Sequence, residues 1–125
     1  MLQIKRDIRM IERRPVGLLV LQGYVDSMDS LALEQAIDEI YAQDVFDIVL
    51  DVTQVSHISS AGWSVIISRL SLLGEKRGFF RFAGMRPDVL QVFNLVGFEN
   101  ISGIEVHDCL GAAFRACRAT VLHAV

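Results

Sequence analysis

The chain has 125 residues and a formal net charge of −3, and 52% of its residues are hydrophobic while 22% are charged. This length suits one domain, and the apolar content excludes intrinsic disorder. The slight negative charge provides no global positive field for nucleic acid or an anionic membrane. We therefore expect one globular domain over residues 1–125 that binds no nucleic acid.

Two further observations concern the cellular setting. No apolar run approaches the roughly 20 residues needed to cross a bilayer, and the N-terminal stretch "MLQIKRDIRM" lacks the apolar core of a signal peptide. Cys109 and Cys117 fall about 12 Å apart along a helix axis, which is too far for a disulfide. We expect a reduced, cytoplasmic protein with no direct membrane insertion.

The N-terminal segment predicts an antiparallel hairpin followed by a helix. The two strands are "IRMIE" and "LLVLQG", and Pro15 and Gly17 mark the turn between them. After Asp26 the apolar spacing changes from two residues to about 3.6, which is typical of a helix. Ser27 or Asp29 can cap its start. Its apolar stripe consists of Leu33, Ala36, Ile37, Ile40 and Tyr41.

The rest of the chain alternates strands with helices. "VFDIVLDV" suits a buried central strand, and "FFRFAG" and "GIEVH" read as two more. One helix starts at Pro87 and stops at Gly97, and another follows the last strand. The helical pattern between the first two of these strands runs from about Ala61 to Leu73, with the apolar stripe Trp63, Ile66, Ile67, Leu70 and Leu73. The order predicts an α/β fold with four amphipathic helices packed on a mixed sheet of four to five strands.

Standard catalytic and cofactor motifs are missing from the sequence. It has no phosphate-binding or dinucleotide-binding glycine loop, and its histidines have no cysteine or carboxylate at zinc-ligand spacing. A hydrolytic pair of Ser60 and His57 would need an orienting group and an oxyanion hole, and the sequence nominates neither. We expect no cofactor, no metal and no enzymatic activity, and hydrolysis by Ser60 and His57 is the alternative.

The stretch "HISSAGWS" connects the buried central strand to the second helix. Ser59 and Ser60 lie in the N-cap region, where a serine oxygen satisfies a free helix N–H and contributes about 1 kcal/mol. The same free N–H groups and the helix dipole favour an anion. A phosphoryl group on Ser60 would carry about −1.5 to −2 charge and would fit there without unfolding the domain. The corner can therefore serve both as a cap and as a switch.

The outer face of the second helix is weakly polar. Between Ala61 and Leu73 the only charged residue is Arg69, although a helix that covers a sheet usually has a charged outer face. The stripe away from the predicted core holds Val65 and Leu72, and the polar residues are Ser64, Ser68 and Ser71. This pattern predicts contact with another protein.

Three segments together resemble the STAS domain, a family that includes bacterial anti-sigma-factor antagonists and cytoplasmic domains of sulphate transporters. They are "LQGYVD", "VFDIVLDVTQVSHISSAGWSVIISRL" and "KRGFFRFAGMRPDVLQVFNLVGFENI". The resemblance covers the chain from about Arg9 to Leu122. In the antagonists the corner resembles Asp-Ser-Ser-Gly-Leu, and its first serine is phosphorylated by an anti-sigma factor that is also a serine kinase.

At the position of the motif's acidic residue this chain has Ser59, which is a departure from the motif. The motif's phosphoacceptor falls on Ser60. Its second serine becomes Ala61, its glycine is Gly62, and its leucine is replaced by Trp63. The resemblance thus implies phosphorylation of Ser60, with Ser59 as the second choice.

The resemblance also implies partners and a partner-binding surface. The family's Gly-x-apolar-Asp pattern matches residues 23–26 and places Asp26 beside the corner. The implied partners are an anti-sigma factor serine kinase and a PP2C-type phosphatase, and self-association or a larger signalling assembly is a further possibility. The alternative is a constitutive scaffold subunit of a stress-sensing complex, or an accessory subunit of a membrane transporter, in which the serines only cap the helix. The expected partner-binding residues are Asp26, Met28, Ser59, Ala61, Gly62, Trp63 and Val65.

Overall fold

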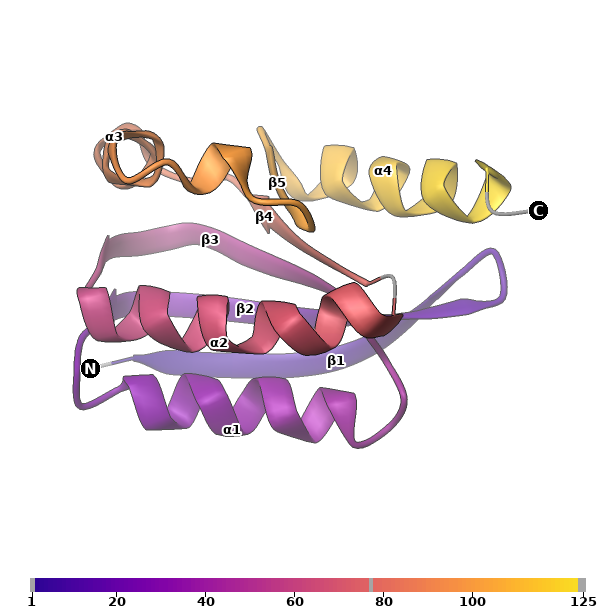
Figure 1. Cartoon of the computed structure of the whole chain (residues 1–125), viewed down its shortest axis with the longest axis horizontal. Helices are drawn as coiled ribbons and strands as arrows, with labels where there is room; N and C mark the ends of the chain where they lie inside the picture. Colours follow the sequence, from indigo (N-terminus) through magenta and orange to yellow (C-terminus); the bar gives the residue numbers. More distant parts are fainter. Residues whose placement is uncertain (1, 77, 124–125) are drawn as a thin grey trace.

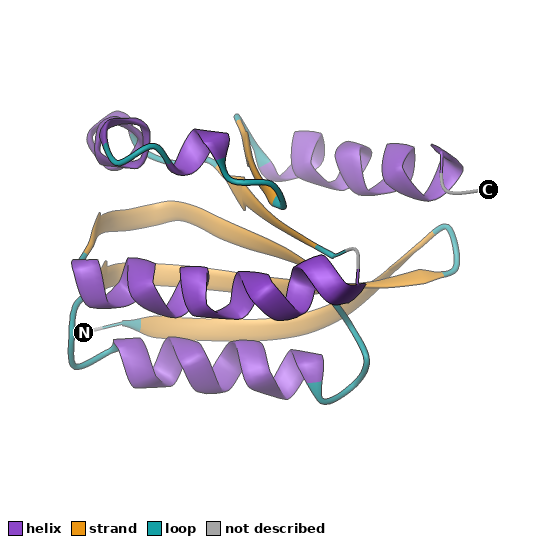
Figure 2. Ribbon diagram, in the orientation of Figure 1, coloured by secondary structure: helices purple, strands orange, loops and turns teal. Residues whose placement is uncertain are grey.

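The structure, a computed structural model, describes residues 2–76 and 78–123, with the side chains of residues 2–70 and 78–119. One five-stranded sheet, drawn in orange in Figure 2, has the spatial order β1-β2-β3-β4-β5. β1 pairs with β2 in the antiparallel sense, and the other neighbouring strands are parallel. The strands are β1 (Gln3–Ile11), β2 (Arg14–Val25), β3 (Asp47–Ile58), β4 (Phe79–Ala83) and β5 (Ile104–His107).

The helices cover both faces of the sheet. α1, α2 and α3 are crossover connections between parallel strands, and right-handed crossovers in one direction place all three on one face. α4 follows the last strand and packs on the opposite face, where Ala113 and Cys117 contact Leu18 and Val49. α1 and α2 run side by side in front of the sheet (Figure 1). The helices are α1 (Ser30–Tyr41), α2 (Ser60–Lys76), α3 (Pro87–Leu95) and α4 (Leu110–His123), with a short 3₁₀ turn, η1 (Phe98–Asn100). The predicted α/β fold is confirmed.

The β1–β2 hairpin turns earlier than the sequence predicts. Glu12 and Arg13 form the two-residue loop, with φ of 50° and 68°, as expected when the turn follows the twist of its strands. Pro15 lies inside β2, opposite Met10. β2 pairs with β3 only from Gly17 onward, so the missing N–H of Pro15 leaves no gap in that ladder.

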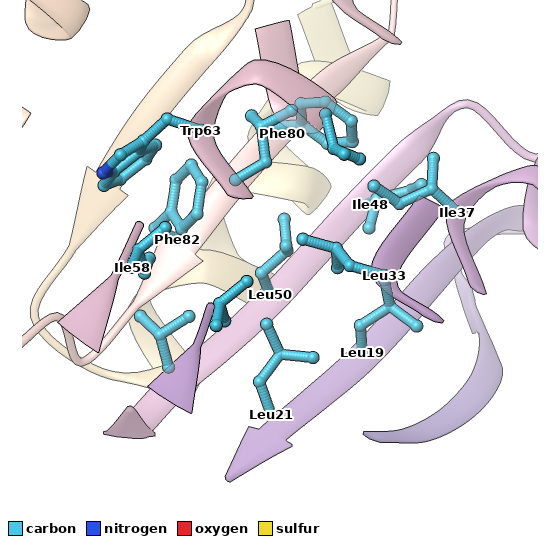
Figure 3. Close-up of a cluster of buried hydrophobic side chains, with 14 of the residues drawn as sticks. Leu19, Leu21, Leu33, Ile37, Ile48, Leu50, Ile58, Trp63, Phe80 and Phe82 are labelled. Atoms are coloured by element: carbon cyan, nitrogen blue, oxygen red, sulfur yellow. The ribbon is translucent and has the colours of Figure 1, made fainter. Parts of the chain in front are cut away.

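The main core lies between the sheet and helices α1, α2 and α3. Figure 3 shows Leu19, Leu50 and Phe82 from the sheet with Leu33 of α1 and Trp63 of α2 in one cluster. The Trp63 ring lies 5.9 Å from Phe82, 5.8 Å from Phe93 and 4.9 Å from Phe98. The first turn of α2 is therefore fixed by aromatic packing against β4, α3 and η1.

The orientation of α2 corrects two expectations. Val65, expected on the outer stripe, is 8% exposed, whereas Ile67, expected in the core, is 40% exposed. Val65 lies one turn before Arg69 on the side that faces α1, so a neighbouring helix covers it. The side chains of Ser71, Leu72 and Leu73 lie outside the described residues.

Candidate functional site

The serine corner and Asp26 lie at the same end of the molecule. The parallel pairing of β2 with β3 places Val25 opposite Ile58, and the Ser59 N–H donates to the Val25 carbonyl at 2.7 Å. α1 and α2 both begin at this end, at the left of Figure 1. The partial positive charges of two helix N-termini therefore lie close to the corner.

The two serines occupy different positions at the start of α2. The Ser59 Oγ accepts a hydrogen bond from the Gly62 N–H at 3.2 Å, and the Ser59 carbonyl accepts one from the Trp63 N–H at 3.0 Å. Ser59 is thus the N-cap residue. Ser60 is the first residue of the helix and is exposed. Its hydroxyl makes no hydrogen bond to any residue described by the structure.

Gly62 allows α2 to approach the ends of β2 and β3. A Cβ atom at this position would lie 2.7 Å from Val25 Cγ1 and 3.0 Å from Ile58 Cγ2. Both distances are shorter than ordinary van der Waals contact, and both neighbours are buried. The glycine therefore sets the distance between the helix start and the sheet, and with it the position of Ser60.

Asp26 organises the turn between β2 and α1. Its Oδ1 accepts hydrogen bonds from the N–H groups of Asp29 and Met28, both at 3.0 Å. These bonds, first of all those from Asp29, hold the pKa of the Asp26 carboxyl below its ordinary value. Asp29 occupies the N-cap position of α1 but makes no side-chain capping bond, so capping by Ser27 or Asp29 is not what starts this helix. Asp26 contributes a fixed negative charge beside the serine corner.

Only part of the expected partner surface is accessible. Met28 is 88% exposed, and Asp26, Ser59 and Ala61 are partly exposed. Gly62, Trp63 and Val65 are buried, which corrects the expectation that the side chains of Trp63 and Val65 contact a partner directly. Trp63 is held in the aromatic core, and Val65 belongs to the same buried cluster as Leu33 and Ile37 of α1.

Two exposed apolar side chains at this end were missing from the sequence analysis. Tyr24 is 53% exposed and Leu31 is 60% exposed. Gly23, with φ of 106°, interrupts the alternation of β2 just before Tyr24, so the strand pattern did not show which way Tyr24 points. We call five residues of this end the corner face: the exposed Tyr24, Met28, Leu31 and Ser60 and the partly exposed Asp26.

Other kinds of site find no support in the described part of the chain. No cluster of three or more His, Cys, Asp or Glu residues there could hold a metal ion. None of the described helices is both long enough and apolar enough to span a membrane. No hydrogen bond joins Ser60 to His57 among the described residues, and His57 lies in β3 with an exposed side chain.

Comparison with known proteins gives the family. A model of the STAS domain matches residues 7–113. The chain belongs to the STAS domain family. This STAS protein is 29% identical over 102 residues to BtrV of Bordetella bronchiseptica, which is named as a candidate anti-sigma factor antagonist; the alignment covers 79% of this chain and 88% of BtrV.

The fold of this STAS protein is also similar to solved structures. An anti-sigma factor antagonist from Mycobacterium paratuberculosis matches with a TM-score of 0.78 and 22% identity over 94% of this chain and 95% of the other. A candidate antagonist from Thermotoga maritima gives a TM-score of 0.78 and 19% identity over 90% and 94%. These likenesses show that the chain has the fold of solved anti-sigma factor antagonists. Proteins of this group are regulatory binding proteins and not enzymes, in agreement with the sequence analysis.

Proposed function

We propose that this STAS protein binds an anti-sigma factor serine kinase through the corner face and that phosphorylation of Ser60 switches the binding off. A PP2C-type phosphatase would restore the binding form. The protein would act in the cytoplasm, as one STAS domain over residues 1–125. The observation that carries the proposal is the division between the two serines: Ser59 caps the helix, and the neighbouring Ser60 presents an exposed hydroxyl.

The surroundings of Ser60 suit a phosphate that changes the surface and leaves the fold intact. The helix N-terminus stabilises an added anion. The cap on Gly62 comes from Ser59 and does not depend on the Ser60 hydroxyl. With Asp26 at the same end, a phosphate would make the corner face strongly negative. Charge repulsion and the cost of desolvating the phosphate would then weaken binding of a partner that fits the uncharged hydroxyl.

The direct test is intact-mass analysis after incubation with ATP and the candidate kinase taken from the gene neighbourhood. We expect the native chain to gain the mass of one phosphoryl group and Ser60→Ala to gain none. A gain in Ser60→Ala, absent from Ser59→Ala, would instead assign the phosphate to Ser59. No gain in the native chain would contradict phosphorylation by that kinase.

Binding measurements separate the switch from a constitutive role. Ser60→Ala should bind the kinase as the native chain does, and Ser60→Asp should lose binding. Ser102→Asp is a matched control, because Ser102 is an exposed serine just before the start of β5. It therefore lies near the N-terminal ends of the parallel strands, whereas the serine corner follows the C-terminal end of β3. Ser102→Asp should bind normally. If Ser60→Asp also binds normally, the serines act only as caps and the protein is a constitutive STAS scaffold or transporter subunit.

A further inference from the structure

The indole N–H of Trp63 is a buried donor without an acceptor. Trp63 is 5% exposed, and its Nε1 has no hydrogen-bond partner among the residues that the structure describes. Figure 3 shows the indole nitrogen on the edge of the ring that is turned away from Phe80 and Phe82. Because a buried N–H without a partner is costly, the position favours a ligand that brings an acceptor.

Trp63 lines a small pocket directly beside the serine corner. The pocket has a volume of about 180 Å³ and lies between the end of β3, the first turn of α2 and the start of α3. Its apolar walls come from Ile58, Val89 and Val92. Its polar groups, apart from Trp63, are Ser56, His57 and Asp88. This volume is below the roughly 300 Å³ of ordinary small-molecule sites, so it suits a single side chain.

We propose that this pocket binds the primary amide of an Asn or Gln side chain from the partner that covers the corner face. The amide carbonyl accepts the hydrogen bond from Trp63 Nε1–H, and an amide N–H donates to the Asp88 carboxylate. The assignment to a partner side chain rests on the function proposed above. Ser56, His57 and Ile58 immediately precede Ser59, so a protein seated on Ser60 lies within reach of the pocket.

The chemistry of the lining favours the amide over a carboxylate, a ketone or a cationic side chain. A carboxylate could accept from Trp63, but it would be repelled by the negative charge of Asp88. A ketone could accept from Trp63 and would leave Asp88 without a donor. A lysine or arginine side chain could pair with Asp88 but has no acceptor for the indole N–H. A primary amide has both an acceptor and donors, and its short alkyl stem fits the apolar walls.

Trp63 is the only tryptophan of the chain, so its indole N–H gives a single resonance in a ¹⁵N-labelled sample. The probe is propionamide, which reproduces the Gln side chain. We expect a saturable shift of the indole resonance with a dissociation constant on the order of millimolar. Propionate at the same ionic strength should give no saturable shift, and 2-butanone should bind more weakly. Asp88→Ala should weaken propionamide binding about tenfold.

Two results would overturn the amide site. The first is the absence of a saturable indole shift with propionamide. The second is equal binding of propionamide and propionate, which would show that Asp88 does not select the ligand. Ser60→Asp should bind propionamide as the native chain does. The result of the propionamide titration therefore does not depend on whether phosphorylation of Ser60 switches partner binding.

A pocket-filling variant tests the partner assignment. Val92 is 44% exposed and lines the pocket from α3, so Val92→Phe should block propionamide without disturbing the core and without adding a second indole resonance. The same variant should weaken binding of the kinase. Leu95→Phe, on the same helix at a side chain that is 78% exposed and does not line the pocket, is the control. Equal binding of the kinase to Val92→Phe and the native chain would overturn the assignment to a partner side chain.

Discussion

At the residue scale, the position of the corner depends on Gly62, which has no side chain. Gly62→Ala places a methyl group 2.7 Å from Val25 and 3.0 Å from Ile58. The helix or both strand ends must move, and such overpacking costs about 1–3 kcal/mol, more than the roughly 1 kcal/mol that alanine gains over glycine in a helix. We expect Gly62→Ala to lower the midpoint of urea unfolding.

Gly111→Ala in α4 is the matched control for Gly62→Ala. Gly111 is also helical, but it is exposed, and a Cβ there would meet the flexible end of Arg115 at 3.4 Å and the Cys109 Sγ at an ordinary contact distance of 4.0 Å. We expect it to be neutral or stabilising by up to about 1 kcal/mol. Loss of stability of the same size in both variants would contradict the packing role of Gly62.

At the element scale, a charged clamp holds α2 against α1. The Arg69 guanidinium bonds Asp38 at 2.7 and 2.8 Å and Glu34 at 2.6 Å. These bonds, that from Asp38 first, raise the pKa of Arg69. The Arg69 side chain is 21% exposed, so the pair is only partly screened by water. Arg69, the only charged residue between Ala61 and Leu73, therefore connects α2 to α1.

We expect Arg69→Met to destabilise the fold by about 1–2 kcal/mol, because a bidentate pair and a second carboxylate lose their partner together. The difference from the native chain should shrink as salt is raised in urea unfolding. Arg118→Met is the control, since Arg118 is 64% exposed and pairs only with Glu12 at 3.1 Å among the described contacts. It should change the unfolding free energy by less than about 0.5 kcal/mol. Equal losses would argue against the clamp.

At the scale of the whole molecule, the two faces of the sheet have separate cores. The face under α4 contains Cys117, which is 2% exposed and whose Sγ lies 3.4 Å from the Arg81 guanidinium. Burial raises the pKa of the Cys117 thiol, and the thiolate is the reactive form. Cys109, at the start of α4, is exposed. Modification of Cys109 therefore needs no unfolding, whereas modification of Cys117 requires that its burial between the sheet and α4 be lost.

We expect iodoacetamide to modify Cys109 in the native protein and to leave Cys117 unmodified until the sheet and α4 separate. In a Cys109→Ser variant, the labelled fraction across a urea series should follow the global unfolding curve measured by circular dichroism. Labelling of Cys117 well below the unfolding midpoint would show instead that α4 detaches on its own.

Much of the fold follows from local patterns. The change of apolar spacing after Asp26 predicts α1, whose stripe from Leu33 to Tyr41 is buried as expected. Pro87 starts α3 and Gly97, with φ of 80°, follows its end. The segment "HISSAGWS" marks the strand-to-helix corner, because capping preference and glycine placement act within a few residues.

Interactions between segments decided the remainder. The sequence placed Val65 outside and Ile67 inside, because one helix stripe does not show where a neighbouring helix lies. Tertiary contacts also placed charged residues of the strands in the interior: Asp47 is buried against Arg14 at 2.9 Å and Arg81 against Glu105 at 3.0 Å.

The sequence by itself determined the order of elements and the residues of the corner. Only the tertiary structure assigned the cap to Ser59 and the exposed hydroxyl to Ser60, and only it buried the indole N–H of Trp63 without a partner among the described residues. The physical reason is that capping and periodicity are local. Exposure and hydrogen-bond satisfaction instead depend on the strands and helices that meet at this end of the sheet.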